Sequence, residues 1–221
     1  MTITSISLRK LIKIMYLDQS RRISALRGDI REDMARDAGN IGAGGDFYAP
    51  FWYDAKEHVF ERRDLHDATL ERIQANPRRE RLYPLLEQGF LLWWNSRRRW
   101  TNAPFEPADV MRSRYTVADL NAVVKIDSVL SVRDSQDEDH FVYPYFSPDP
   151  PLSEEAGRVS LWLLGQALPN ADIEEIRVLD VIRGQTFSID RMPLSGNEES
   201  IFIARYADLI IQSNNLRREY E

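Results

Sequence analysis

The sequence predicts an α+β protein, in which a helical part at residues 1–103 precedes a mixed sheet flanked by helices at residues 108–221. This prediction depends on two observations. Apolar residues recur every three or four positions in the first part, whereas runs rich in β-branched residues alternate with turns in the second. The pattern changes at residues 101–107, a segment with two prolines and no periodicity, so we expect the boundary between the two parts there.

The first part is expected to be helical from residue 5 to residue 38, because two apolar stripes recur there at helical spacing. The stripes consist of Leu8, Leu11, Ile12 and Met15, and of Ile23, Leu26, Ile30 and Met34. The glycine-rich segment 39–45 ends this region. It does not follow an expected strand, and no lysine–serine or lysine–threonine pair comes after it. We therefore interpret it as a linker and not as a phosphate-binding loop.

Residues 46–60 are dense in aromatic side chains, which we interpret as part of the core, with a base-stacking platform as the alternative. A short helix is expected at residues 64–75. A longer helix then begins at Asn76 and Pro77 and runs to about residue 99, with Pro84 either bending it or marking its true start. Because apolar residues cover most sides of this helix, we expect it to be central and Trp93 to be buried.

Three consecutive arginines, Arg97, Arg98 and Arg99, lie at the end of this helix. In the simplest interpretation they complement the negative end of the helix dipole. The alternative is a patch that binds nucleic acid or an acidic partner, because Trp94 and Trp100 lie beside the arginines and an indole ring can hold a guanidinium group by a cation–π contact.

The second part carries the most ordered pattern of the sequence. Strands are expected at 111–117, 122–132 and 141–146, a helix at 153–168, a hairpin at 176–182 and 185–189, and a last helix at 197–218. The run at 122–132 is long and β-branched, which is typical of a central strand with both faces covered. The acidic segment 134–139 lacks the ligand spacing of a calcium loop, so we interpret it as a solvated turn. The helix that starts after Ser153 is expected to bury Trp162.

Composition excludes several classes of protein. The sequence has no cysteine, so a disulfide-linked partner and a thiolate metal site are both excluded. No apolar run reaches the length of a membrane span, and we expect no membrane partner and a cytoplasmic location. The net charge is −6, whereas proteins that hold DNA over much of their surface are usually basic. Binding to nucleic acid would therefore need a local basic patch.

The order of elements from residue 111 onward, with Ile126 and Asp127 on the long strand, resembles the core of the PD-(D/E)XK nuclease superfamily, especially its RecB-like exonuclease branch. The resemblance implies a restriction-endonuclease-like fold. In that family the next strand carries a carboxylate and, two residues later, a lysine, and the following helix carries a glutamine and a tyrosine four residues apart. The residues at these four positions are Tyr143, Tyr145, Arg158 and Trp162.

In that family two carboxylates hold a magnesium ion and the lysine helps to activate the attacking water. Magnesium prefers carboxylate ligands, so the resemblance implies that Asp127 alone holds no metal and that activity is lost, with no cofactor. The alternative is a migrated magnesium site that uses Asp127, Lys125 on the same side of the strand, and Glu106 as a second carboxylate; Asp109 and Asp180 are further candidates. The simpler interpretation of Lys125 and Asp127 is an ion pair at the edge of the strand.

Three functions remain as hypotheses. The first is a non-catalytic, nuclease-like module that acts as a scaffold or binding subunit in DNA processing, a mobile element or phage defence. Its partner is another protein or, through the patch of Arg97, Arg98, Arg99 and Trp100, a nucleic acid. The second is an active metal-dependent nuclease with the migrated lysine site. The third is a protein-interaction subunit unrelated to nucleases, with an interface made of the aromatic segment and the tryptophan-rich helix. We expect the first.

Overall fold

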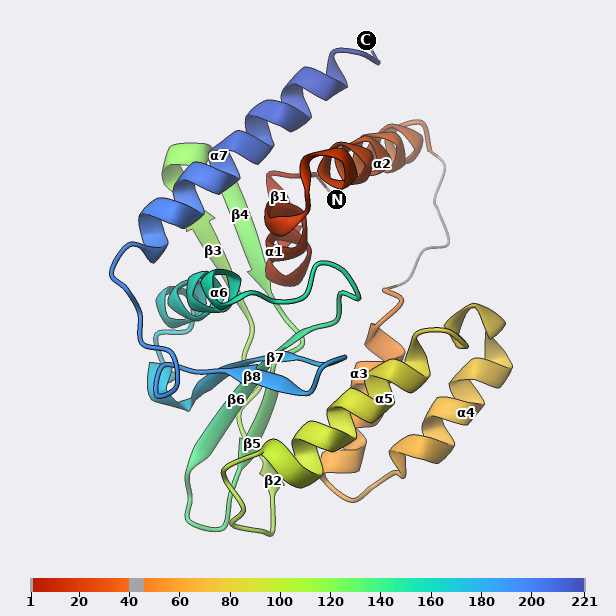
Figure 1. The fold of residues 1–221 in the computed structure, drawn as a ribbon, viewed down its shortest axis with the longest axis vertical. Coiled ribbons are helices and arrows are strands. Elements are labelled where there is room, and N and C mark those ends of the chain that lie inside the picture. Colours follow the sequence, from red (N-terminus) through yellow and green to blue (C-terminus); the bar gives the residue numbers. More distant parts are fainter. Residues whose placement is uncertain (1, 40–45, 221) are drawn as a thin grey trace.

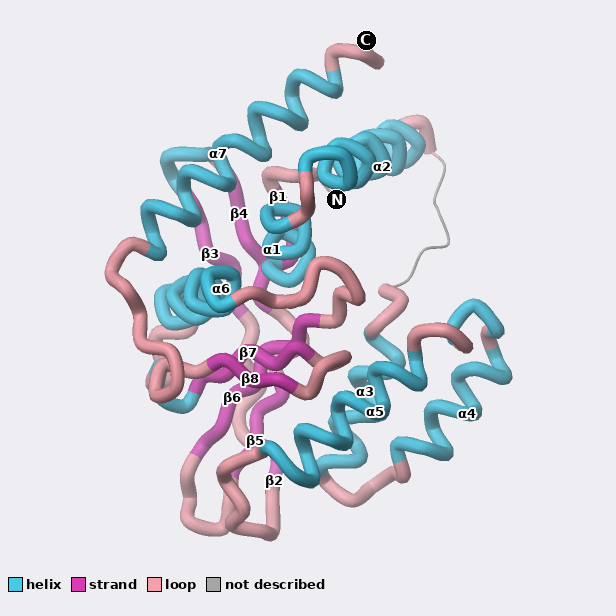
Figure 2. The backbone as a smooth tube through the Cα atoms, viewed as in Figure 1, coloured by secondary structure: helices cyan, strands magenta, loops and turns pink. Residues whose placement is uncertain are grey.

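The computed structural model describes residues 2–39 and 46–220, and it confirms the α+β class. Its strands form two sheets that meet in the middle of the molecule, with helices outside them (Figures 1 and 2). The smaller sheet has the order β1–β4–β3 and the larger one β2–β5–β6–β7–β8. The glycine-rich segment that we interpreted as a linker lies outside the described residues, except for Gly39.

The bounds of the elements are as follows. The strands are β1 (Ser5–Ser7), β2 (Glu106–Pro107), β3 (Ser113–Val117), β4 (Ala122–Ile126), β5 (Leu130–Arg133), β6 (Asp139–Tyr145), β7 (Ile176–Asp180) and β8 (Gln185–Phe187). The helices are α1 (Leu8–Tyr16), α2 (Gln19–Asp37), α3 (Ala49–Val59), α4 (Leu65–Ala75), α5 (Tyr83–Leu92), α6 (Glu154–Ala167) and α7 (Glu198–Arg217). A π-helical turn, Trp93–Arg97, follows α5, and short 3-10 turns lie at Pro77–Arg79, Ala118–Leu120 and Ile173–Glu175.

Two hydrophobic cores lie on opposite faces of the larger sheet. Along β6, Phe141, Tyr143 and Tyr145 belong to the core that α1, α6 and α7 share with the smaller sheet. Val142, between them, and Phe146 belong to the other core, which α3 and α5 complete. This alternation follows from the two-residue repeat of a strand. The larger sheet is therefore covered on both faces.

The expected strand at 122–132 is in fact two strands that belong to different sheets. β4 ends at Ile126, and the chain turns at Ser128, whose φ is +65°, before β5 begins in the larger sheet. The carbonyl groups of this bend find partners on α3, where the Trp52 indole donates to Ser128 O and the Lys56 ammonium donates to Val129 O at 2.6 Å. The prediction of one strand was wrong because these partners are distant in sequence and hydrophobic periodicity does not report them.

The N-terminal segment also differs from the prediction of a helix at 5–38. It starts with the short strand β1, which pairs in parallel with β4, and its helical part is interrupted between α1 and α2. A strand of three residues is too short to produce a detectable period. In the next helical region, Pro84 marks the true start of α5 and not a bend, and a 3-10 turn takes the place of the expected first turn.

The remaining elements of the second part agree with the prediction. β6, α6, the β7–β8 hairpin and α7 lie within a few residues of their expected bounds, and α6 connects the parallel strands β6 and β7. Trp93 is buried, with 1% of its surface exposed, which confirms that prediction. Trp162 is only half-buried, against Tyr115 and Phe202, so the prediction of burial was wrong for it.

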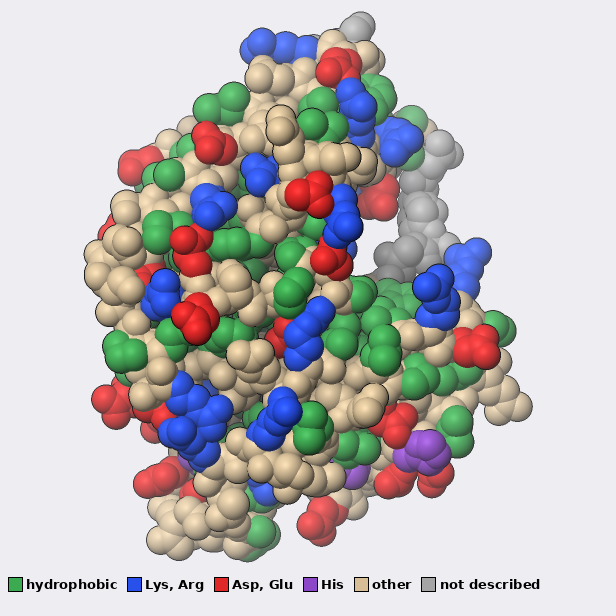
Figure 3. Space-filling view, viewed as in Figure 1, with side chains coloured by type: hydrophobic (Ala, Val, Ile, Leu, Met, Phe, Trp, Pro, Cys, Tyr) green, Lys and Arg blue, Asp and Glu red, His purple; other side chains and the backbone are tan. Residues whose placement is uncertain are grey.

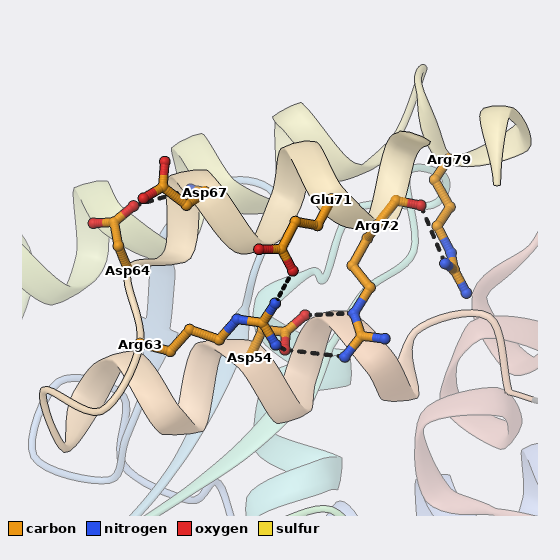
Figure 4. Close-up of polar contacts among 7 residues, drawn as sticks. All are labelled: Asp54, Arg63, Asp64, Asp67, Glu71, Arg72 and Arg79. Carbon is orange, nitrogen blue, oxygen red and sulfur yellow. Dashed lines mark hydrogen bonds and ion pairs between the residues drawn. The ribbon is translucent and has the colours of Figure 1, made fainter. Parts of the chain in front are cut away.

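A buried carboxylate joins α3 to the segment that contains α4 (Figure 4). Asp54 is 1% exposed and accepts hydrogen bonds from Arg63 Nη1 at 3.0 Å and from Arg72 Nε and Nη2 at 2.8 and 3.1 Å. Arg63 also donates to Glu71. Two guanidinium groups thus neutralise one buried negative charge, and they fix α4 against α3.

None of the helices in the described chain is both long enough and apolar enough to span a membrane.

Candidate functional site

The residues at the nuclease-like positions lie on β6 and α6, where Arg158 pairs with Glu198 and Trp162 packs against Tyr115 and Phe202. Tyr143 and Tyr145 are on β6, and each is 2% exposed. Tyr143 Oη accepts a hydrogen bond from the backbone N–H of Arg9 at 3.0 Å, and Tyr145 Oη donates one to Pro150 O at 2.8 Å. Both phenols therefore have structural partners.

Burial also keeps these phenols neutral. It raises the pKa of Tyr143 well above the usual value, and the nearby Asp127 carboxylate raises it further. Burial raises the pKa of Tyr145 to about 12. A neutral phenol is a poor ligand for magnesium, which prefers anionic oxygen. The two positions that hold the carboxylate and the lysine in the nuclease family thus supply neither a metal ligand nor a charged amine here.

Asp180, another candidate ligand, is already committed to other partners. It lies opposite Tyr145 in the β6–β7 ladder and is 1% exposed. Its carboxylate accepts hydrogen bonds from Leu152 N at 3.1 Å and from Arg183 at 3.0 Å. Burial raises its pKa, and these partners oppose the shift. Asp180 therefore anchors the chain between β6 and α6. Since Asp180 is held by these partners and the two phenols are neutral, the residues around Asp127 do not fit a magnesium ion.

The structure does not bring Lys125, Asp127 and Glu106 together. Lys125 lies on β4 opposite Arg114, and among the described residues no hydrogen bond or ion pair joins it to Asp127. Glu106 is on β2 opposite Arg133, which lies at the far end of β5. Arg133 is six residues after Asp127, and six residues of extended chain span up to about 20 Å. The Asp109 carboxylate is also near Arg133, since its charge raises the pKa of that guanidinium group.

The Lys56 ammonium group, on α3, interacts electrostatically with the Asp127 carboxylate. Burial lowers the pKa of Lys56 to about 8, Arg112 lowers it further, and Asp127 opposes this shift. Its ammonium group donates to Val129 O, one residue after the carbonyl that Trp52 contacts. Trp52 and Lys56 are one turn apart on α3, so together they hold the bend. The spacing alone indicated a shared helix face but not its target.

A groove of about 480 Å³ lies beside Tyr145, between α1, α2 and the segment that follows β6. Its walls carry both signs of charge, and several of these charges are paired with each other. Lys10 donates to Asp29 at 2.6 Å, and Arg9 pairs with Asp46. Asp127 does not line this groove. The groove carries Asp29, Glu32 and Asp46, but Lys10 and Arg9 pair with two of these carboxylates. Among the described residues, the group of three whose ligand atoms could hold a metal ion lies elsewhere, at Asp134, Glu138 and His140.

The turn between β5 and β6 is exposed at residues 135–138, as expected for a solvated turn, but Asp134 at its start is buried. Asp134 is 4% exposed, and Asp134, Glu138 and His140 have ligand atoms within 4.8 Å of one another. Asp134 accepts hydrogen bonds from the backbone N–H groups of Gln136 and Glu138 and from the Asn102 amide at 2.9, 3.1 and 3.0 Å. These contacts use its oxygen atoms to close the turn, so we assign Asp134 a structural role.

The arginines at residues 97–99 do not all face the same way. The π-helical turn places Arg97 on the β7–β8 turn, where its Nη1 donates to Arg183 O at 2.9 Å and Gly184 O at 3.2 Å. Close packing makes this contact possible, because a Cβ atom on Gly89 of α5 would come within 2.1 Å of Val181 O. Arg99 extends into solvent, with 62% of its side chain exposed.

Arg98 is half-buried and Trp100 is buried, so both have packing roles, although both also line the surface depression described below. The guanidinium carbon of Arg98 lies 3.7 Å from the Trp94 ring centre and 4.4 Å from that of Phe105. Its Nε and Nη1 atoms are buried without a hydrogen-bond partner, and burial lowers the pKa of Arg98 to about 10. Trp100 is 7% exposed and stacks on His140, with ring centres 4.4 Å apart. Both residues stabilise the fold beneath the patch.

Two arginines from distant parts of the sequence complete the patch. Arg177 of β7 and Arg191, after β8, line the same surface depression as Arg97 and Arg99. We define the arginine patch as Arg97, Arg99, Arg177 and Arg191. Asp190 is the single carboxylate among the residues that line the depression. Figure 3 shows basic side chains gathered at the lower left, beside the positions of β6 and β8 in Figure 1.

The chemistry of the arginine patch differs from that of the Asp127 bend. Four guanidinium groups offer many N–H donors in planar forks, which match the oxygen atoms of phosphate. Guanidinium groups are neither nucleophiles nor metal ligands, so the chemistry that these four side chains offer is the binding of an oxyanion. Comparison with known proteins assigns no family, since no protein-family model, no curated protein and no solved structure matches this chain.

Proposed function

We propose that this protein is a non-catalytic binding module with a nuclease-like core, which holds the phosphate groups of a nucleic acid at the arginine patch. It would act as a scaffold or binding subunit in DNA processing, in a mobile element or in phage defence. The observation that carries the proposal is the convergence of four arginines from three separate segments onto one surface of a protein with a net charge of −6. Like charges repel, so such a cluster is most stable with an anionic partner.

Two features support the nuclease-like core. β3 pairs antiparallel with β4 in the smaller sheet, and β5 pairs antiparallel with β6 in the larger one. The chain then crosses over through α6 and returns as β7 parallel to β6, and this order along the chain is the one on which the resemblance depends. The loss of catalysis is supported by the two buried phenols, which occupy the positions of the family carboxylate and lysine.

The binding part of the proposal is tested by fluorescence anisotropy with labelled single- and double-stranded DNA and RNA at increasing salt. We expect binding that weakens steeply with salt, because phosphate contacts release counterions. The double variant Arg99→Gln, Arg191→Gln is expected to weaken binding. It is also expected to reduce the slope of log K against log salt by about 0.9 for each phosphate group that the protein no longer neutralises.

The matched control is Arg78→Gln, Arg81→Gln, which removes the same charge from exposed positions outside the patch. Equal weakening of binding in both double variants would show a non-specific charge effect and would contradict the role of the patch. No salt-sensitive binding, either by the unmodified protein or by a variant that lacks the Asp190 carboxylate, would favour a protein partner instead.

The catalytic part is tested with the same nucleic acids in magnesium and in manganese, where we expect no cleavage. Cleavage that disappears in Asp127→Ala or Lys125→Ala would overturn the proposal in favour of a migrated metal site.

A further inference from the structure

Asp190 places a carboxylate among the arginines of the patch. Its Oδ2 atom accepts a hydrogen bond from Arg99 Nη1 at 2.6 Å, and its Oδ1 atom accepts one from the Ser188 hydroxyl. Ser188 is 3% exposed, so this hydroxyl is fixed in position, whereas the Asp190 side chain is 50% exposed. The carboxylate is thus held at the surface by a guanidinium group on one side and a buried hydroxyl on the other.

The charges around Asp190 show that it is the internal counter-ion of the patch. The hydrogen bond from Ser188 lowers the pKa of Asp190, and Arg99, Arg177 and Arg191 lower it further. Arg177 is half-buried, and burial lowers its pKa; Asp190 opposes this shift, while Arg191 and Arg99 add to it by repulsion. Three arginines therefore repel one another, and one carboxylate offsets part of that repulsion.

We propose that Asp190 occupies a phosphate subsite, in which Arg99, Arg177, Arg191 and the Ser188 hydroxyl bind a phosphate oxyanion of the ligand once the Asp190 carboxylate moves away. This inference rests on the proposed function, because it names a ligand group for the same patch. A carboxylate oxygen and a phosphate oxygen accept the same charge-assisted hydrogen bonds, so the two compete for these donors.

The geometry favours phosphate once it is present. Within the described part of the chain, Asp190 forms a direct ion pair with Arg99 alone. Arg177 instead donates to Glu175 O at 2.7 Å, and Arg191 donates to Thr186 Oγ1 at 3.4 Å. A carboxylate has two acceptor oxygen atoms, whereas a phosphate group has more oxygen atoms arranged as a tetrahedron and can reach several guanidinium groups at once. Asp190 thus lowers the affinity of the patch for every anion by competing for the same N–H donors. A phosphate displaces the carboxylate more readily than an anion that forms fewer hydrogen bonds with the arginines.

The test compares Asp190→Asn with the unmodified protein in the anisotropy assay, with one oligonucleotide carrying either a 5′-phosphate or a 5′-hydroxyl. Asparagine keeps the size of the side chain and removes the competing charge. We expect binding to become about two- to fivefold tighter at low salt, the range for removing exposed ion pairs, with a smaller gain at high salt. A gain confined to the 5′-phosphate form assigns the subsite to a terminal phosphate, and an equal gain assigns it to the backbone.

Three controls separate competition from other effects. Asp119→Asn removes the same charge from an exposed position outside the patch and is expected to change affinity little. Asp190→Glu keeps the charge and is expected to bind as the unmodified protein does. Arg99→Gln is expected to weaken binding more in the Asp190→Asn background, because Arg99 is then free for the ligand. Melting curves of all variants verify that they are folded.

The outcomes distinguish this inference from the proposed function. Salt-sensitive binding that is unchanged in Asp190→Asn, or changed equally in Asp119→Asn, overturns the inference and leaves the proposed function in place. Binding that is absent from the unmodified protein but present in Asp190→Asn supports the inference, since the carboxylate then blocks the site. Absence of binding from both proteins overturns the inference and the proposed function together.

Discussion

Asp54 offers the sharpest test of how the helical layer is held together. Its carboxylate is 1% exposed and accepts three hydrogen bonds from Arg63 and Arg72, whose side chains are each 31% exposed. The substitution Asp54→Asn keeps the volume of the side chain, removes its charge and turns one acceptor into a donor that faces two cations. We expect the free energy of unfolding to fall.

The magnitude follows from the contacts. Removing one partner of a buried ion pair costs about 3–5 kcal/mol, and a hydrogen bond to a charged group contributes about 1.5–3 kcal/mol. Both arginines can still reach water, and asparagine keeps one acceptor, which reduces the loss. We therefore expect Asp54→Asn to lower the free energy of unfolding by about 2–3 kcal/mol, and the melting temperature by roughly 5–10 °C for a chain of this size.

Urea titration followed by tryptophan fluorescence measures this change. The control is Asp67→Asn, an exposed residue in the first turn of α4, with an expected change within about 0.5 kcal/mol. Arg72→Met is expected to cost less in the Asp54→Asn background than alone, since it then removes a cation that no longer has its partner. A change in Asp54→Asn no larger than that in Asp67→Asn would refute the view that this carboxylate stabilises the packing of α3 on α4.

Two further predictions concern the core. Trp93→Ala is expected to cost about 3–5 kcal/mol in a urea titration because Trp93 is 1% exposed, and Trp162→Ala to cost less because Trp162 is half-buried; equal costs would contradict this assignment. Burial lowers the pKa of His140, so the unfolded chain binds its proton more readily and stability is expected to fall as pH drops below about 6.5, the usual histidine value. His140→Gln is expected to reduce this loss of stability, measured as the difference between the urea midpoints at pH 7.5 and pH 5.5. The variant also separates the contribution of His140 from that of His66, whose pKa is raised by the hydrogen bond to Glu87. An unchanged pH dependence of stability in this variant would exclude His140 as the source of the loss.

Local pattern was sufficient for much of the fold. Hydrophobic periodicity, turn residues and helix caps predicted β6, α6, the β7–β8 hairpin and α7. These signals act over a few residues, so they can be recognised in the sequence alone. The sequence alone also showed that tyrosines, Tyr143 and Tyr145, stand where the resemblance to the nucleases would place a carboxylate and a lysine, because this depends only on which residues are present. That the two phenols hold structural contacts with Arg9 and Pro150 was not.

The candidate site divides in the same way. The sequence by itself determined that Arg97 and Arg99 lie at the end of a helix, that cysteine ligands are absent, and that the chain alternates between helical and strand periods. Only the tertiary structure decided that Arg98 turns into an aromatic cage and that Arg177 and Arg191 join the patch. It also decided that the run at 122–132 breaks at Ser128. These outcomes depend on groups that are distant in the chain, such as the indole of Trp52 that satisfies the Ser128 carbonyl, and such contacts exist only once the layers have packed.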